Sequence, residues 1–206
     1  MKYQSTKTYG HERGLSTCFR QPHASHSHCK YLHGYSLGFR FTFGANELDE
    51  RNWVVDFGGL KPLKQWLEDS FDHKVVLDTN DPYLADFVDL ERKGLAQLNI
   101  INGVGVEKFA EHAFTFADEL VRELTDGRCW VDSVECAEHG SNSAIFSSSP
   151  FSLVLLFLIN SIFEKIVIQI KSFYFPFKIL IGISSLLVLA QSATLPFIID
   201  NESYYI

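Results

Sequence analysis

Residues 35–44 alternate between apolar and polar or small side chains, and this alternation limits the fold more than any other feature of the sequence. The apolar members are Leu37, Phe39, Phe41 and Phe43. Successive side chains of a β-strand point to opposite faces, so a period of two predicts a strand with one buried face. His33 and Tyr35 share the parity of the buried set, so both point the same way if the strand begins that early.

Two other segments carry the helical period instead. Apolar residues recur at intervals of three and four from Leu60 to Phe71 and again over 106–124, which predicts two amphipathic helices. Thr125-Asp126-Gly127 ends the second helix. Shorter predicted elements are a strand within 2–19, a loop over 20–32, an extended piece at 53–55, a helix near 83–93, an extended piece near 97–101, and strands at 130–138 and 142–146. Strands and helices in this order predict an α+β domain with helices on one face of the sheet.

The charge balance excludes one class of partner. The chain carries 18 basic and 25 acidic residues, a formal net charge of −7, and no basic run. Phosphate contacts need clustered Lys and Arg, so we expect no nucleic-acid partner. The four cysteines show no CxxC spacing and the first seven residues are polar, which favours a cytoplasmic protein with reduced thiols over a disulfide framework, although one bridge stays open.

The composition changes after Pro150. We therefore divide the chain into a domain over 1–149 and a hydrophobic extension over 150–206. Residues 179–199 contain no charge and would be long enough to span a bilayer at about 20 residues per helix. Residues 151–170 are nearly as apolar but carry Glu164 and Lys165. Two interpretations of this extension stay open. It is a membrane anchor, or it is an extension read past the natural end of a complete domain. The second is favoured, because the predicted strands and helices of the domain are complete before Pro150.

The residue types of an enzyme site are concentrated in a few short segments. Cys29 precedes His33 by four residues, and His23, His26 and His28 lie just upstream. Asp72-His73 and Glu138-His139 supply acids and further imidazoles from distant parts of the chain. A thiol, imidazoles and carboxylates together can perform proton transfer on a small polar heterocycle.

These segments resemble the 6-pyruvoyl/6-carboxy-tetrahydropterin synthase family over about residues 3–146. The motifs are Cys29 with Leu32-His33-Gly34 and Ser36, Val55-Asp56-Phe57 with Leu60-Lys61, Asp72-His73, Glu107 at a helix start, and Glu138 with Ile145-Phe146. The resemblance implies the tunnelling fold: an antiparallel four-stranded sheet with two helices on one face, whose subunits join edge strands in a homo-oligomer. It also implies a substrate like dihydroneopterin triphosphate.

The resemblance implies a role for each matching residue. Cys29 would be the general base, Asp72 would orient His73 in a proton relay, and Glu138 would accept hydrogen bonds from the pterin ring. Glu107 matches a substrate-binding position, but an acidic residue at a helix start also simply complements the helix dipole. A helix-capping Asp72 with a surface His73, and a solvated Glu138, are the structural alternatives.

The family's zinc site is the point at which this sequence departs from the pattern. The family uses three histidines, and Phe19 and Tyr35 stand at two of the matching positions. Only His33 remains, whereas catalytic zinc usually has three protein ligands. In one interpretation His26 and His28 join His33 around a displaced zinc ion, because residues two apart on an extended segment project to the same side. In the other interpretation no catalytic metal binds.

The sequence therefore predicts a pterin-pathway lyase. It would act on dihydroneopterin triphosphate and form 6-carboxy-tetrahydropterin for queuosine-type 7-deazaguanine synthesis, with 6-pyruvoyl-tetrahydropterin synthase as a close variant. The alternative from a different class is a non-catalytic pterin-binding or assembly subunit. Membrane attachment through 179–199 would apply only if the extension is a genuine anchor.

Overall fold

The computed structural model of the chain describes residues 2–147. The proposed domain boundary near residue 149 and the hydrophobic segments 151–170 and 179–199 lie outside the described residues. Between residues 2 and 147, no helix is both long and apolar enough to cross a membrane.

The sheet contains seven strands, and it corrects the expectation of four antiparallel ones. The strands are β1 (Tyr3–Tyr9), β2 (Leu15–Phe19), β3 (His33–Ala45), β4 (Lys74–Asp78), β5 (Leu98–Ile101), β6 (Cys129–His139) and β7 (Asn142–Ser147). They lie in the order β5-β4-β2-β3-β6-β7, and β1 also pairs with β3. The antiparallel part is β1, β2, β3, β6 and β7, whereas β4 pairs in parallel with both β2 and β5. The sheet is therefore mixed.

The long strand β3 organises the sheet, as its alternation predicts. Its C-terminal part pairs with β1 and its N-terminal part pairs with β2. Between β1 and β2 the chain makes a short 3₁₀ turn, His11–Arg13, and Gly14 follows it with a φ of 74°. A left-handed φ is most accessible to glycine, so this residue lets the chain rejoin β3 after the interruption. Loop 20–32 then closes the wide β2–β3 hairpin, as expected.

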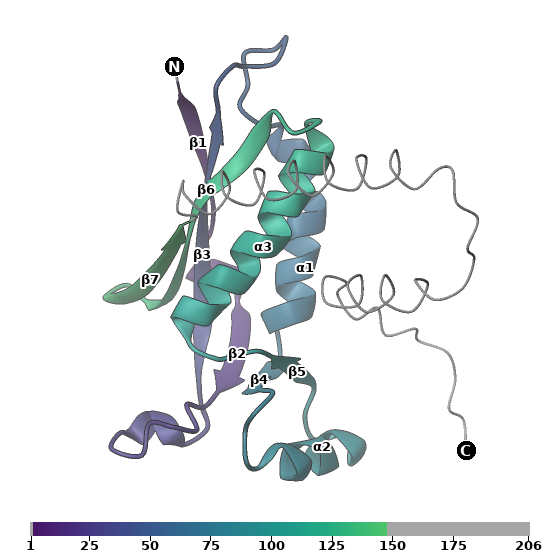
Figure 1. Ribbon diagram of the computed structural model, residues 1–206. Helices are drawn as coiled ribbons and strands as arrows, with labels where there is room; N and C mark the ends of the chain where they lie inside the picture. The colour runs from purple at the N-terminus through teal and green to yellow at the C-terminus, as the bar shows by residue number, and fades with distance from the viewer. Residues whose placement is uncertain (1, 148–206) are drawn as a thin grey trace, which may run out of the picture. The chain divides into compact units, whose positions relative to one another are not determined.

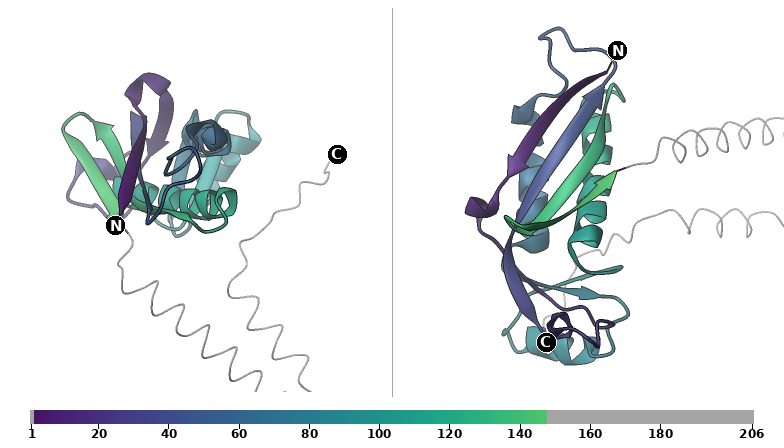
Figure 2. Two further views of the ribbon diagram at one scale, coloured as in Figure 1. Left: turned by 90° about the horizontal axis from the view of Figure 1, so that it is seen from above. Right: turned by 90° about the vertical axis from the view of Figure 1, so that its left-hand side faces the viewer.

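Both long helices cover the same face of the sheet, and this prediction is confirmed (Figures 1 and 2). They are α1 (Lys61–Phe71) and α3 (Val106–Leu124), and a shorter helix α2 (Leu84–Arg92) lies in the segment between β4 and β5. Phe39, Phe41 and Phe43 of β3 are buried. The Phe71 ring lies 5.1 Å from that of Phe39 and 5.3 Å from that of Phe109, so phenylalanines join the sheet to both helices.

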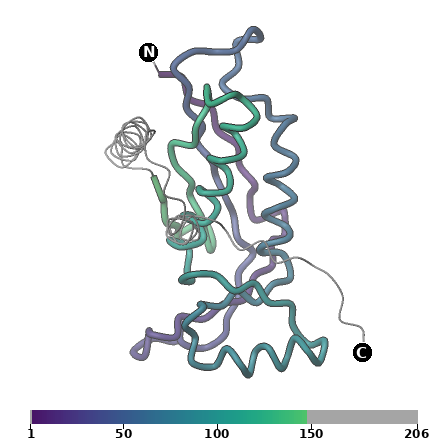
Figure 3. Tube along the Cα trace, turned by 45° about the vertical axis from the view of Figure 1, so that its right-hand side comes forward, coloured from purple at the N-terminus to yellow at the C-terminus, as the bar shows by residue number. Residues whose placement is uncertain are grey.

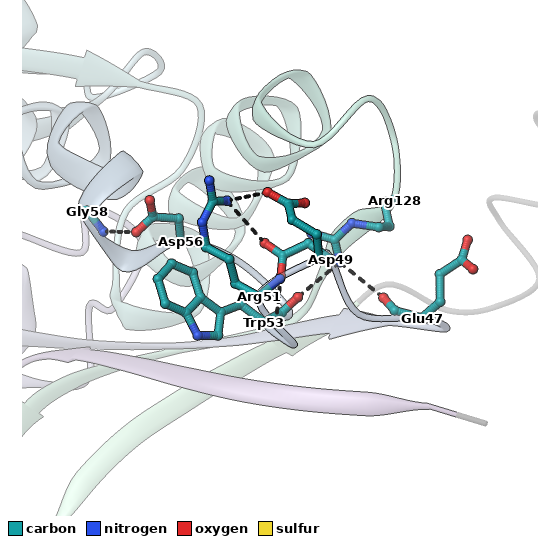
Figure 4. A network of polar contacts seen from close by, with 8 residues as sticks. Glu47, Asp49, Arg51, Trp53, Asp56, Gly58 and Arg128 are labelled. Atoms are coloured by element: carbon teal, nitrogen blue, oxygen red, sulfur yellow. Dashed lines mark hydrogen bonds and ion pairs between the residues drawn. The ribbon is translucent and has the colours of Figure 1, made fainter.

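The extended piece expected at 53–55 is wrong, because this segment is a turn that a carboxylate holds in place (Figure 4). Asp49 Oδ1 accepts hydrogen bonds from the backbone amides of Trp53 at 2.8 Å and Arg51 at 2.9 Å. The Trp53 bond, followed by the Arg51 bond and nearby arginines, lowers the pKa of Asp49 although desolvation opposes the shift. Arg128 donates to the carbonyl oxygens of Glu47 and Trp53. Amides used in this way cannot pair with a neighbouring strand.

Candidate functional site

The β2–β3 hairpin brings three predicted positions together on one face of the sheet. Phe19 pairs with His33, and Thr17 pairs with Tyr35. The ring centroids of Phe19 and His33 lie 4.8 Å apart, those of His33 and Tyr35 lie 5.6 Å apart, and those of Phe19 and Tyr35 lie 6.1 Å apart. Phe19 is only 2% exposed, whereas His33 and Tyr35 are partly exposed. The face therefore carries a buried phenyl ring with a histidine and a tyrosine above it.

The hydrogen bond of His33 defines which of its ring nitrogens is available. Nδ1 lies 2.8 Å from the carbonyl oxygen of Tyr31. A carbonyl oxygen can only accept, so Nδ1 carries the proton in this bond. When the ring is neutral, Nε2 is then the unprotonated nitrogen and can accept a hydrogen bond or bind a metal ion.

Tyr35 connects residues from three separate parts of the sequence. Its pKa is raised, first by desolvation and then by the negative charges of Glu138 and Cys29. Glu138 precedes His139 on β6, and the Cys29 carbonyl oxygen accepts from the amide of Gln21, two residues after Phe19 of β2. The His139 ring lies 6.0 Å from the Tyr35 ring. The structure thus brings Cys29, Tyr35, Glu138 and His139 to one end of the β3–β6 region.

Glu107 belongs to the same neighbourhood. Burial raises the pKa of Cys136, and the charges of Glu138 and Glu107 raise it further. Cys136 is buried on β6, and Glu107 is exposed in the first turn of α3. The same part of α3 packs against the β2–β3 hairpin, because the ring of Phe109 lies 5.1 Å from that of Phe19.

Cys29 lies in a short 3₁₀ turn whose backbone is held from both sides. Its amide donates to Ser27 Oγ at 3.2 Å, and its carbonyl oxygen accepts from the Gln21 amide at 2.7 Å. Gln21 Nε2 in turn donates to the carbonyl oxygen of Val104, just before α3, at 2.7 Å. The side chain of Cys29 is exposed. Loop 20–32 is thus attached to the α3 end of the site and presents an accessible thiol there.

Asp72 and His73 form the pair that the sequence predicts. His73 Nδ1 lies 2.8 Å from Asp72 Oδ1, and the same carboxylate oxygen accepts from the Ser16 amide at 3.2 Å. The carboxylate therefore holds the imidazole with Nδ1 as donor and leaves Nε2 unprotonated when the ring is neutral, and the His73 side chain is 81% exposed. His73 has a φ of 56°, and its amide donates to the carbonyl oxygen of Ser16.

The hydrogen-bonding pattern places this pair away from Tyr35. Thr17 of β2 pairs with Lys74 on one side and with Tyr35 on the other. Neighbouring strands lie about 4.8 Å apart, so the backbone at residue 74, next to His73, is about 10 Å from that of Tyr35. Among residues 2–147, the hydrogen bonds of His73 lead to Asp72 and Ser16 and not to Cys29.

A buried ion pair that the sequence does not predict lies at the start of loop 20–32, although its two contacting atoms make no hydrogen bond. Arg20 Nε lies 3.5 Å from Asp81 Oδ2, and the two side chains are 13% and 0% exposed. Asp81 Oδ1 accepts from the Tyr83 amide at 2.9 Å, and the Arg20 guanidinium lies 5.2 Å from the centroid of the Tyr83 ring. Figure 3 shows loop 20–32 and α2 at the same end of the body. No local pattern of the sequence links Asp81 to Arg20.

The histidines do not form a ready zinc site. Over the described residues, no three His, Cys, Asp or Glu side chains converge closely enough to hold a metal ion. His26 and His28 are exposed on the loop, and their joining His33 around zinc stays a prediction. The three facing positions 19, 33 and 35 offer one imidazole, one phenol and one hydrocarbon ring. Zinc in proteins is bound by His, Cys, Asp or Glu, so these three residues do not fit a three-ligand zinc site.

A separate cavity lies at the other end of β1. It has a volume of about 470 Å³ and is lined by residues that include Tyr3, Trp53 and Phe57. None of the predicted catalytic or metal-binding residues lines it. Of the predicted site residues, Cys29 on loop 20–32 and Glu107 on α3 are exposed, and His33, Tyr35 and Glu138 on β3 and β6 are partly exposed.

Comparison with known proteins places this geometry in context. The family model described as 6-pyruvoyl tetrahydropterin synthase matches residues 11–149. Proteins named 6-carboxy-5,6,7,8-tetrahydropterin synthase are similar over short stretches: one of Rickettsia bellii is 43% identical over 54 residues, and one of Aquifex aeolicus is 34% identical over 65 residues. These matches span 26% and 32% of this chain and only 39% and 40% of those two relatives.

Solved structures share the fold. An uncharacterized protein from Wolinella succinogenes superposes with a TM-score of 0.57 at 21% identity, and the match covers 72% of this chain and 99% of that one. A catalytic-residue mutant of Plasmodium vivax 6-pyruvoyltetrahydropterin synthase superposes with a TM-score of 0.52 at 14% identity, covering 72% of this chain and 99% of that one. At these identities the similarity establishes the tunnelling-type fold alone.

Proposed function

Because this chain belongs to the 6-pyruvoyl tetrahydropterin synthase family, we propose that it is a pterin-pathway lyase that acts on dihydroneopterin triphosphate. Two relatives named 6-carboxy-5,6,7,8-tetrahydropterin synthase support 6-carboxy-tetrahydropterin as the product. That product would feed queuosine-type 7-deazaguanine synthesis. Elimination of triphosphate to give the 6-pyruvoyl product is the close variant.

One observation carries this proposal: the His139 ring, next to Glu138 on β6, lies 6.0 Å from that of Tyr35, at the end of the β2–β3 hairpin where the Cys29 carbonyl oxygen is bonded to the Gln21 amide. An acidic anchor and a thiol, separated by more than 100 residues in sequence, thus share one neighbourhood. A carboxylate can accept two parallel N–H bonds from the amino group and ring nitrogen of a pterin. A pterin held by Glu138 would then place its side chain toward Cys29.

Each of the chain's own residues has a defined task in this proposal. Cys29 takes a proton from the substrate side chain, and His73 Nε2 exchanges protons while Asp72 holds Nδ1. Cys29 needs its thiolate form to act as a base. The Asp72–His73 pair lies about 10 Å from Tyr35 across β2. It therefore contacts the reacting atoms if the extended substrate spans this distance, or if the pair comes from a neighbouring protomer.

A second protomer is part of the proposal. In the described part of the chain, β1 pairs only with β3 and β7 pairs only with β6. Each strand therefore presents one row of unpaired backbone groups, which favours pairing with another chain. We propose a homo-oligomer joined through these edges, with the substrate bound where protomers meet.

Turnover of dihydroneopterin triphosphate by the full chain tests the function. We expect 6-carboxy-tetrahydropterin, acetaldehyde and triphosphate to appear together in chromatography and mass spectrometry. Release of triphosphate with a 6-pyruvoyl product would favour the close variant. The second candidate, a non-catalytic pterin-binding subunit, is favoured by the two altered positions Phe19 and Tyr35. Pterin binding without any product would support that candidate and contradict the lyase.

Replacing Glu138 with glutamine should weaken the binding of neopterin by about 10- to 150-fold, because hydrogen bonds to a charged group contribute about 1.5–3 kcal/mol. Titration calorimetry of the full chain with neopterin measures this change. Glu135→Gln is the matched control on the same strand, because the Glu135 carboxylate is already bonded to Ser143 Oγ at 2.7 Å. Equal affinities of the two variants would contradict the assignment of Glu138.

A further inference from the structure

Phe19, His33 and Tyr35 are arranged as three ligands of one zinc ion would be. Only His33, however, is a residue type that binds zinc in proteins. Phe19 and His33 are directly opposed on β2 and β3, and Tyr35 lies two residues along β3 on the same face. Their ring centroids are 4.8–6.1 Å apart. Three histidines at these positions would be near enough to share one ion, whereas the residues present supply a single imidazole.

The packing of Phe19 shows that the hydrocarbon ring is an integral part of the fold. It is 2% exposed, and its ring meets that of Phe109 of α3 edge-on at 5.1 Å. This ring joins the hairpin to the helix that carries Glu107. A metal ion bound beside Phe19 would have one protein ligand fewer and would contact a hydrocarbon ring instead. This contact disfavours a charged ion.

Tyr35 supplies a polar group at the second altered position. The His139 ring, next to Glu138 on β6, lies 6.0 Å from the Tyr35 ring. A phenol can donate one hydrogen bond and accept others. His33 Nε2 adds an acceptor, since Nδ1 is engaged with Tyr31.

We infer that this chain binds its ligand without zinc, and that the Tyr35 hydroxyl and His33 Nε2 provide the polar contacts at the place where the family fold holds a metal ion. The ligand is a pterin side chain bearing hydroxyl groups, and this part of the inference rests on the proposed function. The inference opposes the zinc site of His26, His28 and His33 that the sequence leaves open, so one set of measurements decides between them.

Zinc content tests the inference without any variant. The full chain is incubated with excess zinc chloride, desalted and measured by mass spectrometry of the metal. We expect less than about 0.1 zinc per protomer, because a stable protein site for zinc needs at least three protein ligands. About one zinc per protomer in the wild-type chain would overturn the inference. The double variant His26→Ala with His28→Ala is then measured in the same way. Loss of zinc in that variant would establish the loop histidines as ligands.

A gain of metal binding tests the geometry. Phe19→His combined with Tyr35→His should raise the zinc content to about one per protomer, because three imidazoles then face one another. Adding His33→Ala to this variant should remove the zinc again. Failure of a folded double variant, with a native circular-dichroism spectrum, to bind zinc would show that the three positions do not form a site.

Neopterin binding tests the role of Tyr35 separately from the proposed reaction. We expect the affinity of the wild-type chain to be unchanged by EDTA, and Tyr35→Phe to weaken it about two- to tenfold, the effect of one lost hydrogen bond. An unchanged affinity in Tyr35→Phe would overturn the role of the hydroxyl. If no neopterin binds to any form, the proposed function and this role fail together, whereas the zinc measurement still decides the metal question.

Discussion

Replacing Cys29 with alanine is expected to lower kcat for dihydroneopterin triphosphate by about 10²- to 10⁴-fold, the usual contribution of a positioned general base. The exposed Cys29 thiol lies in a turn fixed by Ser27 and Gln21. Removing the sulfur leaves these backbone bonds in place, so we expect little change in neopterin affinity or in folding. Steady-state kinetics, with calorimetry of neopterin binding, separates the two effects.

The control for this prediction is Cys18→Ala. Cys18 lies on β2 opposite Gly34 and is distinct from the loop that carries Cys29, so its loss should leave kcat within about twofold, as expected for a side chain outside the chemistry. If Cys29→Ala turns over at the wild-type rate, Cys29 is not the base. A loss of activity with an equal loss of neopterin affinity would instead assign it to binding.

Replacing Asp81 with alanine should lower the free energy of unfolding by about 3–5 kcal/mol, because it leaves the buried Arg20 charge without its partner. Asp81 is 0% exposed in its side chain and Arg20 is 13% exposed. The change is a large fraction of the total, since domains are stable by about 5–15 kcal/mol. Urea unfolding at one fixed protomer concentration measures it, because oligomer formation adds to apparent stability.

Asp89→Ala is the matched control for the buried pair. The Asp89–Arg92 ion pair has a distance of 3.2 Å, but its side chains are 60% and 74% exposed. Exposed pairs contribute about 0–1 kcal/mol, so we expect a change below about 0.5 kcal/mol. Similar effects of the two substitutions would mean that Arg20 and Asp81 are solvated in solution, and would contradict a buried ion pair at the start of loop 20–32.

The periodic elements of this fold could be predicted from the sequence because each is long enough to show its period. The alternation in β3 and the helical repeat in α1 and α3 predict the three elements that form most of the core. Strand β4 was missed, because Lys74–Asp78 has only five residues and its partners are parallel. Parallel pairing with β2 depends on where the chain returns after α1, and no local pattern encodes that contact.

The site was predicted in parts, for a similar reason. Asp72 and His73 are adjacent in sequence, and their hydrogen bond is the local interaction that the sequence suggests. The family resemblance assigns Cys29 and Glu138 to one site and Tyr35 to an altered metal-binding position, and their approach in space depends on the β3–β6 register. The burial of Asp81 beside Arg20 is a contact between distant parts of the chain, and no local sequence pattern predicts it.

The most direct test of the account is the rate at which iodoacetamide alkylates Cys29, measured by peptide mass spectrometry with and without saturating neopterin. Cys129 and Cys136 are buried, and burial raises the pKa of Cys129 to about 11 and that of Cys136 well above its usual value, so neither thiol competes. We predict that neopterin slows alkylation of Cys29 at least about tenfold in the wild-type chain, because a bound ligand covers the thiol. At the same neopterin concentration, Glu138→Gln should lose this protection. An equal alkylation rate in wild-type protein saturated with neopterin would contradict a shared site for the thiol and the glutamate.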